Sequence, residues 1–132
     1  KVVTAGNYYG QEYQLASALE LTSTNSTSPQ TKLTMNTTNL PDGTYKVIFH
    51  WMWNRNSAAN SARFDIQLNG ATQGTTGTIE MEAKDTTDWS PETRTFYWAL
   101  SGANTITFRY WGESVGNSTY VSDATIELIR VK

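Results

Sequence analysis

The sequence predicts an all-β protein, an antiparallel β-sandwich of the jelly-roll type with about eight strands. Two observations carry this prediction: apolar residues recur at every second position in several segments, and turn residues separate those segments. The clearest alternation spans residues 44–53. Its odd positions are all large and apolar: Tyr45, Val47, Phe49, Trp51 and Trp53. We expect that face to form the floor of the core. The even positions are mixed, so the opposite face meets solvent, a partner or a second layer.

The other elements follow in chain order. Residues 1–4 are a short β-prone opening, residues 7–13 form a loop or irregular arm, and a helix over residues 11–19 is not excluded. Further strands are predicted at residues 18–22, 31–37, 62–68, 75–84, 93–100, 105–110 and 120–131. Turns are predicted at Pro41-Asp42-Gly43 and Asn69-Gly70. The segments 23–30, 54–62, 85–92 and 112–118 are polar loops.

Length and composition limit the class of protein. The 132 residues form one domain, residues 1–132, with residues 1–16 as a candidate N-terminal arm. There is no cysteine, and charged residues make up only 17% of the chain. A net charge of -2 without a basic run argues against nucleic-acid binding, and no apolar segment approaches a membrane-spanning length. The chain begins at Lys1 rather than Met, so we expect a processed product or a fragment of a longer polypeptide.

The titratable residues give little support to an enzyme. Glu80 and Glu82 alternate on one face of a predicted strand, a spacing of ~7 Å that glycosidases also use, but a solvated strand face produces the same pattern. His50 is the only histidine and lies mid-strand without a nucleophile motif. We therefore predict no enzyme and no cofactor. A calcium site that uses Asp85, Asp88 and loop carbonyls is left open.

Aromatic residues are the more informative signal, since they make up 12% of the chain and include five Trp. Exposed aromatics can stack on sugar rings, anchor a subunit interface, or simply cap the ends of the sandwich. Those that lie in or near loops, or on the polar side of a strand, are the candidate interface or ligand-stacking residues: Tyr8, Tyr9, Tyr13, Trp89, Tyr97, Trp111 and Tyr120.

Five segments carry a resemblance that extends over the last two-thirds of the chain. They are LPDGTYKVIFHW at 40–51, FDIQLNG at 64–70, EMEAKD at 80–85, ALSGANTITFRY at 99–110 and DATIELIRV at 123–131. Together they resemble jelly-roll modules of tailed-phage virion structural proteins and, more loosely, carbohydrate-binding modules. The phage resemblance implies a capsid decoration (cement) protein, commonly a homotrimer, or a module of a tail fibre or receptor-binding protein.

These observations leave three hypotheses. The first is a virion-surface structural protein that contacts copies of itself and a major capsid or tail protein, with its N-terminal arm reaching a neighbour. The second is an extracellular carbohydrate-binding module in which Trp89, Trp111 and Tyr97 or Tyr120 stack on a glycan. The third is a subunit of an extracellular filament or surface layer. None of the three involves nucleic acid or a membrane.

Overall fold

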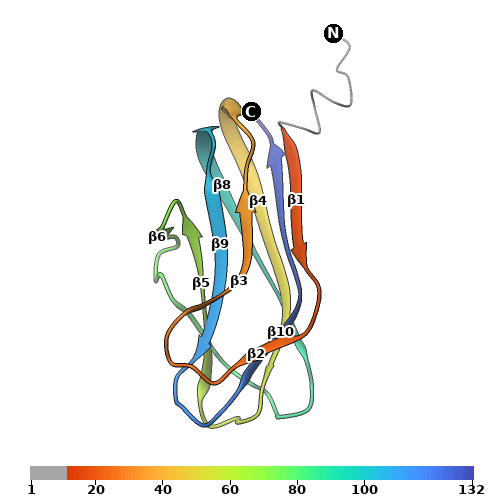
Figure 1. Ribbon diagram of the computed structural model, residues 1–132, viewed down its shortest axis with the longest axis vertical. Coiled ribbons are helices and arrows are strands. Elements are labelled where there is room, and N and C mark those ends of the chain that lie inside the picture. Colours follow the sequence, from red (N-terminus) through yellow and green to blue (C-terminus); the bar gives the residue numbers. More distant parts are fainter. Residues whose placement is uncertain (1–11) are drawn as a thin grey trace.

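The computed structural model describes residues 12–132, which form two antiparallel β-sheets packed face to face (Figure 1). In sheet A the strand order is β1 (Tyr13–Ala18), β10 (Thr119–Arg130), β4 (Leu40–Arg55) and β8 (Ser90–Gly102), and β2 (Thr22–Thr24) also pairs with β10. In sheet B the order is β3 (Gln30–Asn36), β9 (Thr105–Gly112), β5 (Ser61–Leu68) and β6 (Ala71–Thr72), and β7 (Ile79–Glu82) also pairs with β5. The predicted all-β sandwich is confirmed.

The core lies between the sheets and is built largely of aromatic rings. All the odd positions of β4 from Tyr45 to Trp53 are buried, as the alternation predicts. Trp51 lies at the centre, with its ring centroid 4.5 Å from that of Phe108 and 5.2 Å from that of Phe64. β9 and β5 belong to sheet B, so these contacts join the two layers. Burial of such large side chains dominates the stability of a small domain.

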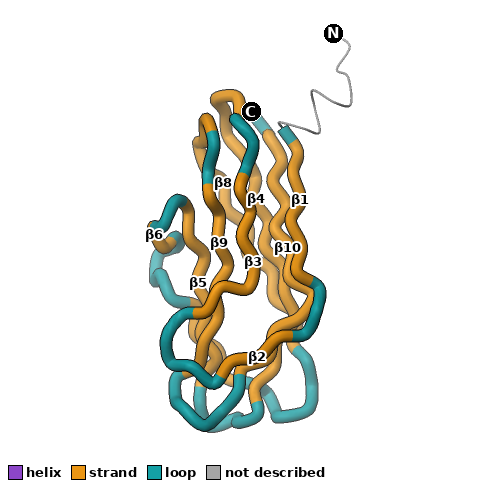
Figure 2. The backbone as a smooth tube through the Cα atoms, viewed as in Figure 1, coloured by secondary structure: helices purple, strands orange, loops and turns teal. Residues whose placement is uncertain are grey.

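The strands are more numerous than the predicted eight or so, because short pieces such as β2 and β6 have no recognisable period. Tyr13–Ala18, the region where a helix was not excluded, is strand β1 and pairs with β10 along all six residues. The candidate arm at residues 1–16 therefore ends in the sheet; residues 1–11, including the β-prone opening, lie outside the described residues. Among residues 12–132 there is no helix, and hence none that could span a membrane (Figure 2).

The predicted turn at Pro41-Asp42-Gly43 is instead an irregularity within β4. The register with β8 shifts between Leu40 and Gly43, and the hydroxyl of Tyr45 donates to the carbonyl of Pro41 at 2.7 Å. A Cβ on Gly43 would lie 2.5 Å from Arg130 Nε, so only glycine allows this close approach. The strand therefore continues through the proline and glycine rather than starting after them.

The other turn prediction is confirmed. Asn69 and Gly70 both have positive φ, 50° and 84°, as a two-residue hairpin of type I′ requires, and they connect β5 to β6. The strand predicted at residues 75–84 is shorter, because Gly74 and Gly77 also adopt positive φ and keep the preceding segment out of the sheet. β8 begins at Ser90 and includes Pro91, which a strand at the edge of a sheet tolerates.

Candidate functional site

The side of sheet A that faces away from sheet B is the candidate site, and we call it the sheet A outer face. It consists of the side chains that alternate with the buried ones on each strand. Its members are Tyr13, Leu15 and Ser17 on β1; Ser122, Thr125, Glu127 and Ile129 on β10; Lys46, Ile48, His50 and Met52 on β4; and Pro91, Thr93, Thr95 and Tyr97 on β8.

Strand register arranges these side chains in rows across the sheet. One row runs through Tyr13, Ile129, Lys46 and Tyr97, and the next runs through Leu15, Glu127, Ile48 and Thr95. The two edges of the face are the most open, since Leu15 is 58% and Tyr97 63% exposed. Each of these rows thus contains large apolar or aromatic groups at the surface, an arrangement typical of interaction sites.

The sheet A outer face has few charges, and they are not ion-paired with one another. Its charged groups at neutral pH are Lys46 and Glu127, and neither forms an ion pair with another described residue. The Glu127 carboxylate instead accepts a hydrogen bond from the Tyr13 hydroxyl at 2.7 Å. His50, two residues beyond Ile48, has its Nδ1 atom 3.2 Å from Thr93 Oγ1. The face is therefore a mixture of apolar, aromatic and hydroxyl side chains, with two charges near its middle that have no ion-pair partner in the described part of the chain.

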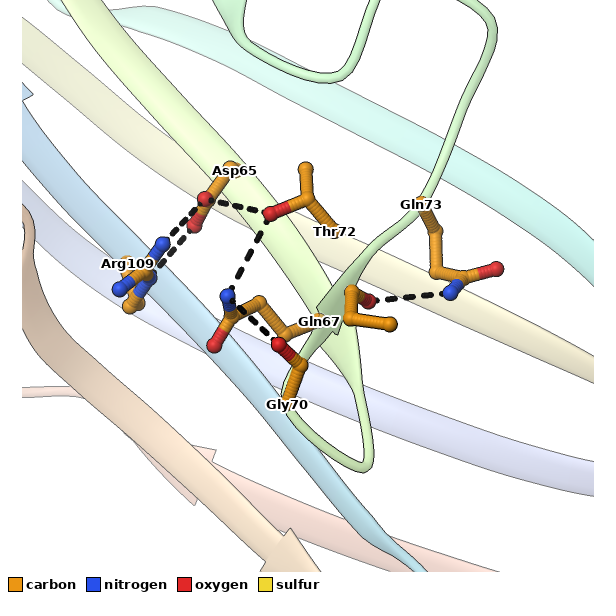
Figure 3. A network of polar contacts seen from close by, with 7 residues as sticks. Asp65, Gln67, Gly70, Thr72, Gln73 and Arg109 are labelled. Atoms are coloured by element: carbon orange, nitrogen blue, oxygen red, sulfur yellow. Dashed lines mark hydrogen bonds and ion pairs between the residues drawn. The ribbon is translucent and has the colours of Figure 1, made fainter.

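The outer face of sheet B differs, because most of its charges are paired with one another. Arg109 binds Asp65 through two hydrogen bonds, from Nε to Oδ1 at 2.8 Å and from Nη2 to Oδ2 at 2.5 Å. The hydroxyl of Thr72 on β6 donates to the same carboxylate at 3.2 Å, and Gln67 reaches that hydroxyl and the carbonyl of Gly70 (Figure 3). The hydrogen bonds that Arg109 donates to the Asp65 carboxylate are the main cause of the raised pKa of Arg109.

A second pair on sheet B joins Arg63 Nη2 and a Glu80 carboxylate oxygen, which are 3.6 Å apart. Most of the charges on this face are thus paired within the chain, and the exposed Glu82 is the exception. The two outer faces of the sandwich therefore differ: sheet B presents mainly paired charges, and sheet A presents few charges among apolar, aromatic and hydroxyl side chains.

The predicted site residues do not form one platform. Tyr13 and Tyr97 share a row of the sheet A outer face, with the strands β10 and β4 between them, at ~14 Å. Tyr120 is half-buried at the other end of β10, opposite Asn54. Trp89 is 37% exposed in the loop before β8. Tyr8 and Tyr9 lie outside the described residues.

Trp111 requires a correction, because its expected exposure is wrong. Its side chain is only 7% exposed. The next residue, Gly112, donates its N–H to the carbonyl of Ser26 at 3.0 Å, which brings the loop after β2 against this end of β9. Trp111 therefore has no free ring face for a sugar.

Sequence reasoning missed a group of exposed leucines at the β1 edge of the molecule. Leu15, Leu19 and Leu21 are 58%, 56% and 58% exposed. Only Leu15 belongs to a strand; the other two lie in the connection to β2. The signal was the alternation of Tyr13 and Leu15, which has meaning only once β1 is recognised as a strand.

The catalytic candidates have ordinary structural partners. Glu80 and Glu82 are both exposed, and Glu80 pairs with Arg63. Within residues 12–132, no group of three His, Cys, Asp or Glu side chains is placed to hold a metal. A shallow open depression of about 330 Å³ between the start of β4 and the end of β8 contains a single titratable side chain, Asp42.

The two aspartates of the calcium hypothesis, Asp85 and Asp88, form hydrogen bonds within their own turn. Asp85 Oδ1 accepts N–H groups from Thr87 at 2.8 Å and from Asp88 at 2.7 Å. The N–H of Asp88, followed by that of Thr87, lowers the pKa of Asp85 to about 2. The hydrogen bond and charge of Asp85 raise the pKa of Asp88. This geometry explains the pair as a turn-stabilising contact.

No protein-family model and no curated protein sequence matches the chain. Solved structures do match its fold. The insecticidal delta-endotoxin Cry8Ea1 of Bacillus thuringiensis superposes with a TM-score of 0.53 at 16% identity, over 86% of this chain and 20% of that one. For the T=1 particle protein of infectious bursal virus the TM-score is 0.62 at 11% identity, over 89% of this chain and 31% of that one.

A carbohydrate-binding domain also matches. The CBM36-1 domain of a multidomain xylanase, from the hindgut metagenome of Trinervitermes trinervoides, has a TM-score of 0.51 at 15% identity, over 87% of this chain and 95% of that one. The chain spans a fifth of the endotoxin and under a third of the viral protein. At such identities the likeness establishes the shared jelly-roll fold, which occurs both in viral capsid proteins and in carbohydrate-binding modules.

Proposed function

We propose that this protein is a non-enzymatic structural subunit of a virion surface, of the capsid-decoration (cement) type, which works by burying the sheet A outer face against protein. The observation that carries the proposal is the contrast between the two outer faces. Sheet B has most of its charges paired within the chain, whereas sheet A has few charges and exposes Tyr97 and Leu15. Removing such a surface from water stabilises an assembly.

Subunit contacts and contacts to a shell protein use the same physics. A stable interface buries ~800 Å² on each partner and is depleted in charge at its centre. The sheet A outer face fits that description, because Lys46 and Glu127 are its only Lys, Arg, Asp or Glu side chains. Tyr97 and Tyr13 supply the aromatic character that interfaces favour. The proposed location is therefore the virion surface, and the proposed partners are copies of this chain and a major capsid or tail protein.

The non-enzymatic part of the proposal rests on what the candidate catalytic groups do. His50 contacts a threonine hydroxyl, Glu80 is paired with Arg63, and the Asp85 carboxylate accepts a hydrogen bond from the N–H of Asp88. General acid or base catalysis needs a carboxyl or imidazole that is free to reach a substrate in an enclosed site. These groups are instead committed to contacts within the chain.

Binding to the native particle tests the proposal. Ile48→Asp places a charge in the centre of the sheet A outer face, and Thr107→Asp places the same charge on the outer side of a central strand of sheet B. We expect the first variant to lose binding to shells purified from the source by about tenfold or more, and the second to bind like the natural chain. Co-sedimentation and electron microscopy of the shells provide the readout. A chain that stays monomeric and never binds a shell or fibre would refute the proposal.

A carbohydrate-binding module is the second candidate, and Tyr97 is the observation that favours it. Its ring is 63% exposed and lies beside Lys46 and Thr95, which could meet sugar hydroxyls. Affinity electrophoresis on a panel of polysaccharides, with Tyr97→Ala and Trp89→Ala as variants, separates the two candidates. Retardation that Tyr97→Ala abolishes would support sugar binding, and the absence of retardation on every polysaccharide would end it.

A further inference from the structure

We propose that the sheet A outer face pairs with the same face of a second copy of this chain, about a two-fold axis that passes between Lys46 and Glu127. The inference rests on the proposed function and makes a second copy of this chain the occupant of the sheet A outer face, so that a shell or tail protein binds the assembled dimer rather than this face. In a two-fold contact the same patch serves both subunits, so residue i meets residue j and j meets i. The patch must therefore complement itself.

The two isolated charges provide that complementarity. Lys46 and Glu127 lie on β4 and β10, the two central strands of sheet A, in adjacent rows: Lys46 is opposite Ile129, and Glu127 is opposite Ile48. An axis that lies in the plane of the face and bisects the line between them exchanges their positions. Each lysine then meets the glutamate of the other copy, and the paired faces carry two reciprocal ion pairs and no net charge from these groups.

The cost of burying Lys46 and Glu127 favours a partner that brings opposite charges. A charge that loses water without gaining a counter-charge is costly, so a wholly apolar occupant would bury both Lys46 and Glu127 without a counter-charge. Within residues 12–132 neither group has an ion-pair partner that could compensate. The Tyr13 hydroxyl, at 2.7 Å, holds the Glu127 carboxylate in place beside the apolar row. A second copy supplies both missing counter-charges at once.

The area of the face matches a stable dimer. Four strands at ~4.8 Å spacing are ~19 Å wide, and the 12 residues of β10 at ~3.4 Å each extend ~40 Å. The product is ~770 Å², close to the ~800 Å² per partner of a standard interface. A trimer, in contrast, requires two different complementary surfaces on each subunit. The two-fold pairing therefore takes the place of the homotrimer that the phage resemblance implies.

Two charge-reversal variants, measured alone and then mixed with each other, test the pairing. Lys46→Glu gives a face with two glutamates, and Glu127→Lys gives a face with two lysines, so each variant alone repels its own copy. Mixed together, the two variants place glutamate opposite lysine at both contacts. We expect each variant alone to dissociate about tenfold more readily than the natural chain in sedimentation velocity, and the equimolar mixture to dimerise again. The double variant with both changes should also dimerise.

Matched controls separate this effect from net charge and from folding. Lys84→Glu and Glu82→Lys make the same changes at exposed positions away from the sheet A outer face, and both should dimerise like the natural chain. Circular dichroism checks that Glu127→Lys, which loses its contact with Tyr13, remains folded; if it does not, Glu127→Gln together with Lys46→Gln tests whether loss of both charges weakens the dimer.

Three results would overturn the pairing: a natural chain that is a strict monomer or trimer, single variants that dimerise normally, or a mixture that fails to associate. A natural chain that still decorates shells after any of these results would leave the proposed function intact. Failure of both dimerisation and shell binding would refute both the two-fold pairing and the proposed function.

Discussion

Arg55 is a buried arginine that is hydrogen-bonded but has no ion-pair partner within residues 12–132. Its side chain is fully buried, and Nη1 donates to Thr119 Oγ1 at 2.6 Å, but no carboxylate pairs with it among the described residues. Burial lowers the pKa of Arg55, and the charge of Glu113 only partly opposes this effect. The guanidinium lies against the backbone of Gly112, where a Cβ would be 2.9 Å from Arg55 Cζ.

Gly112→Ala should therefore destabilise the protein by about 1–3 kcal/mol, because the added methyl group has no room beside the guanidinium. Combining it with Arg55→Met removes the crowding, so the cost of the glycine change should shrink in the double variant. Urea unfolding of the four chains of this cycle measures the coupling. Strictly additive free energies of unfolding would contradict the contact.

The Asp85 and Asp88 pair allows a second test at this scale. Because Asp85 raises the pKa of Asp88, Asp85→Asn should return the pKa of Asp88 towards its ordinary value. In the natural chain, Asp85 itself should titrate near pH 2, so its stabilising contacts are present above pH ~4 and are lost as the pH falls towards 2. Carboxyl NMR titration of the two chains reads both pKa values. An Asp88 that titrates identically in both would disprove the coupling.

At the scale of elements, the connection from β1 to β2 is held by a buried lysine. The side chain of Lys32, on β3, is 1% exposed, and its Nζ donates to the carbonyl of Glu20 at 2.6 Å and to Thr22 Oγ1 at 2.9 Å. The Glu20 carboxylate is 3.7 Å away but itself largely exposed. Desolvation is the largest influence on Lys32 and lowers its pKa, and Glu20 opposes it. The connection from β1 to β2 thus depends on the buried ammonium group of Lys32.

The pH dependence of stability follows from that lowered pKa. As the pH rises, Lys32 in the folded chain loses its proton before the same lysine in the unfolded chain, whose pKa is near 10.5. Since the unfolded state then binds more protons, the free energy of unfolding should rise with pH between the lowered pKa and 10.5. Lys32→Met should remove this rise, whereas Lys84→Met, at an exposed position, should keep it. Urea unfolding at a series of alkaline pH values gives both slopes, and equal slopes would argue against the buried cation.

At the scale of the whole molecule, the first described strand, β1, pairs with the last strand, β10. β1 pairs with β10 along its full length, and both belong to the sheet whose centre is β4 (Figure 1). Ala16 and Ala18 on β1 pack against the core that Trp51 anchors in the middle of the chain. Sheet and core thus connect residues from both ends of the described part, so we expect it to unfold as one cooperative unit.

Ala16→Asp tests this cooperativity, because it places a carboxylate against the core from β1. It should cost about 1–3 kcal/mol, and tryptophan fluorescence and far-ultraviolet circular dichroism should shift to the same lower Tm. Leu21→Asp is the control in the connection that follows β1: Leu21 is 58% exposed and lies outside the sheet A outer face, so its change should cost under ~0.5 kcal/mol. Two separate transitions in Ala16→Asp would show that β1 unfolds independently.

The fold class, and the features that depend on close neighbours along the chain, could be predicted from the amino-acid pattern alone. The alternation over residues 44–53 identified the buried face of β4, and Asn69-Gly70 identified a tight turn, because side-chain direction and positive φ are properties of one or two residues. The placement of Tyr97 on the open side of its strand followed from the same period.

Which surface remains open depends on contacts between distant segments. Trp111 is buried at an end of β9 where the loop after β2 hydrogen-bonds the next residue, Gly112. Pro41-Asp42-Gly43 continues a strand because β8 pairs across it, and Glu80 is paired with an arginine on another strand. The apolar character of the sheet A outer face arises from side chains of β1, β10, β4 and β8, which begin as far apart as residues 13 and 119. Exposure and charge pairing are properties of neighbours in space, and a local period carries no information about segments so remote in the chain.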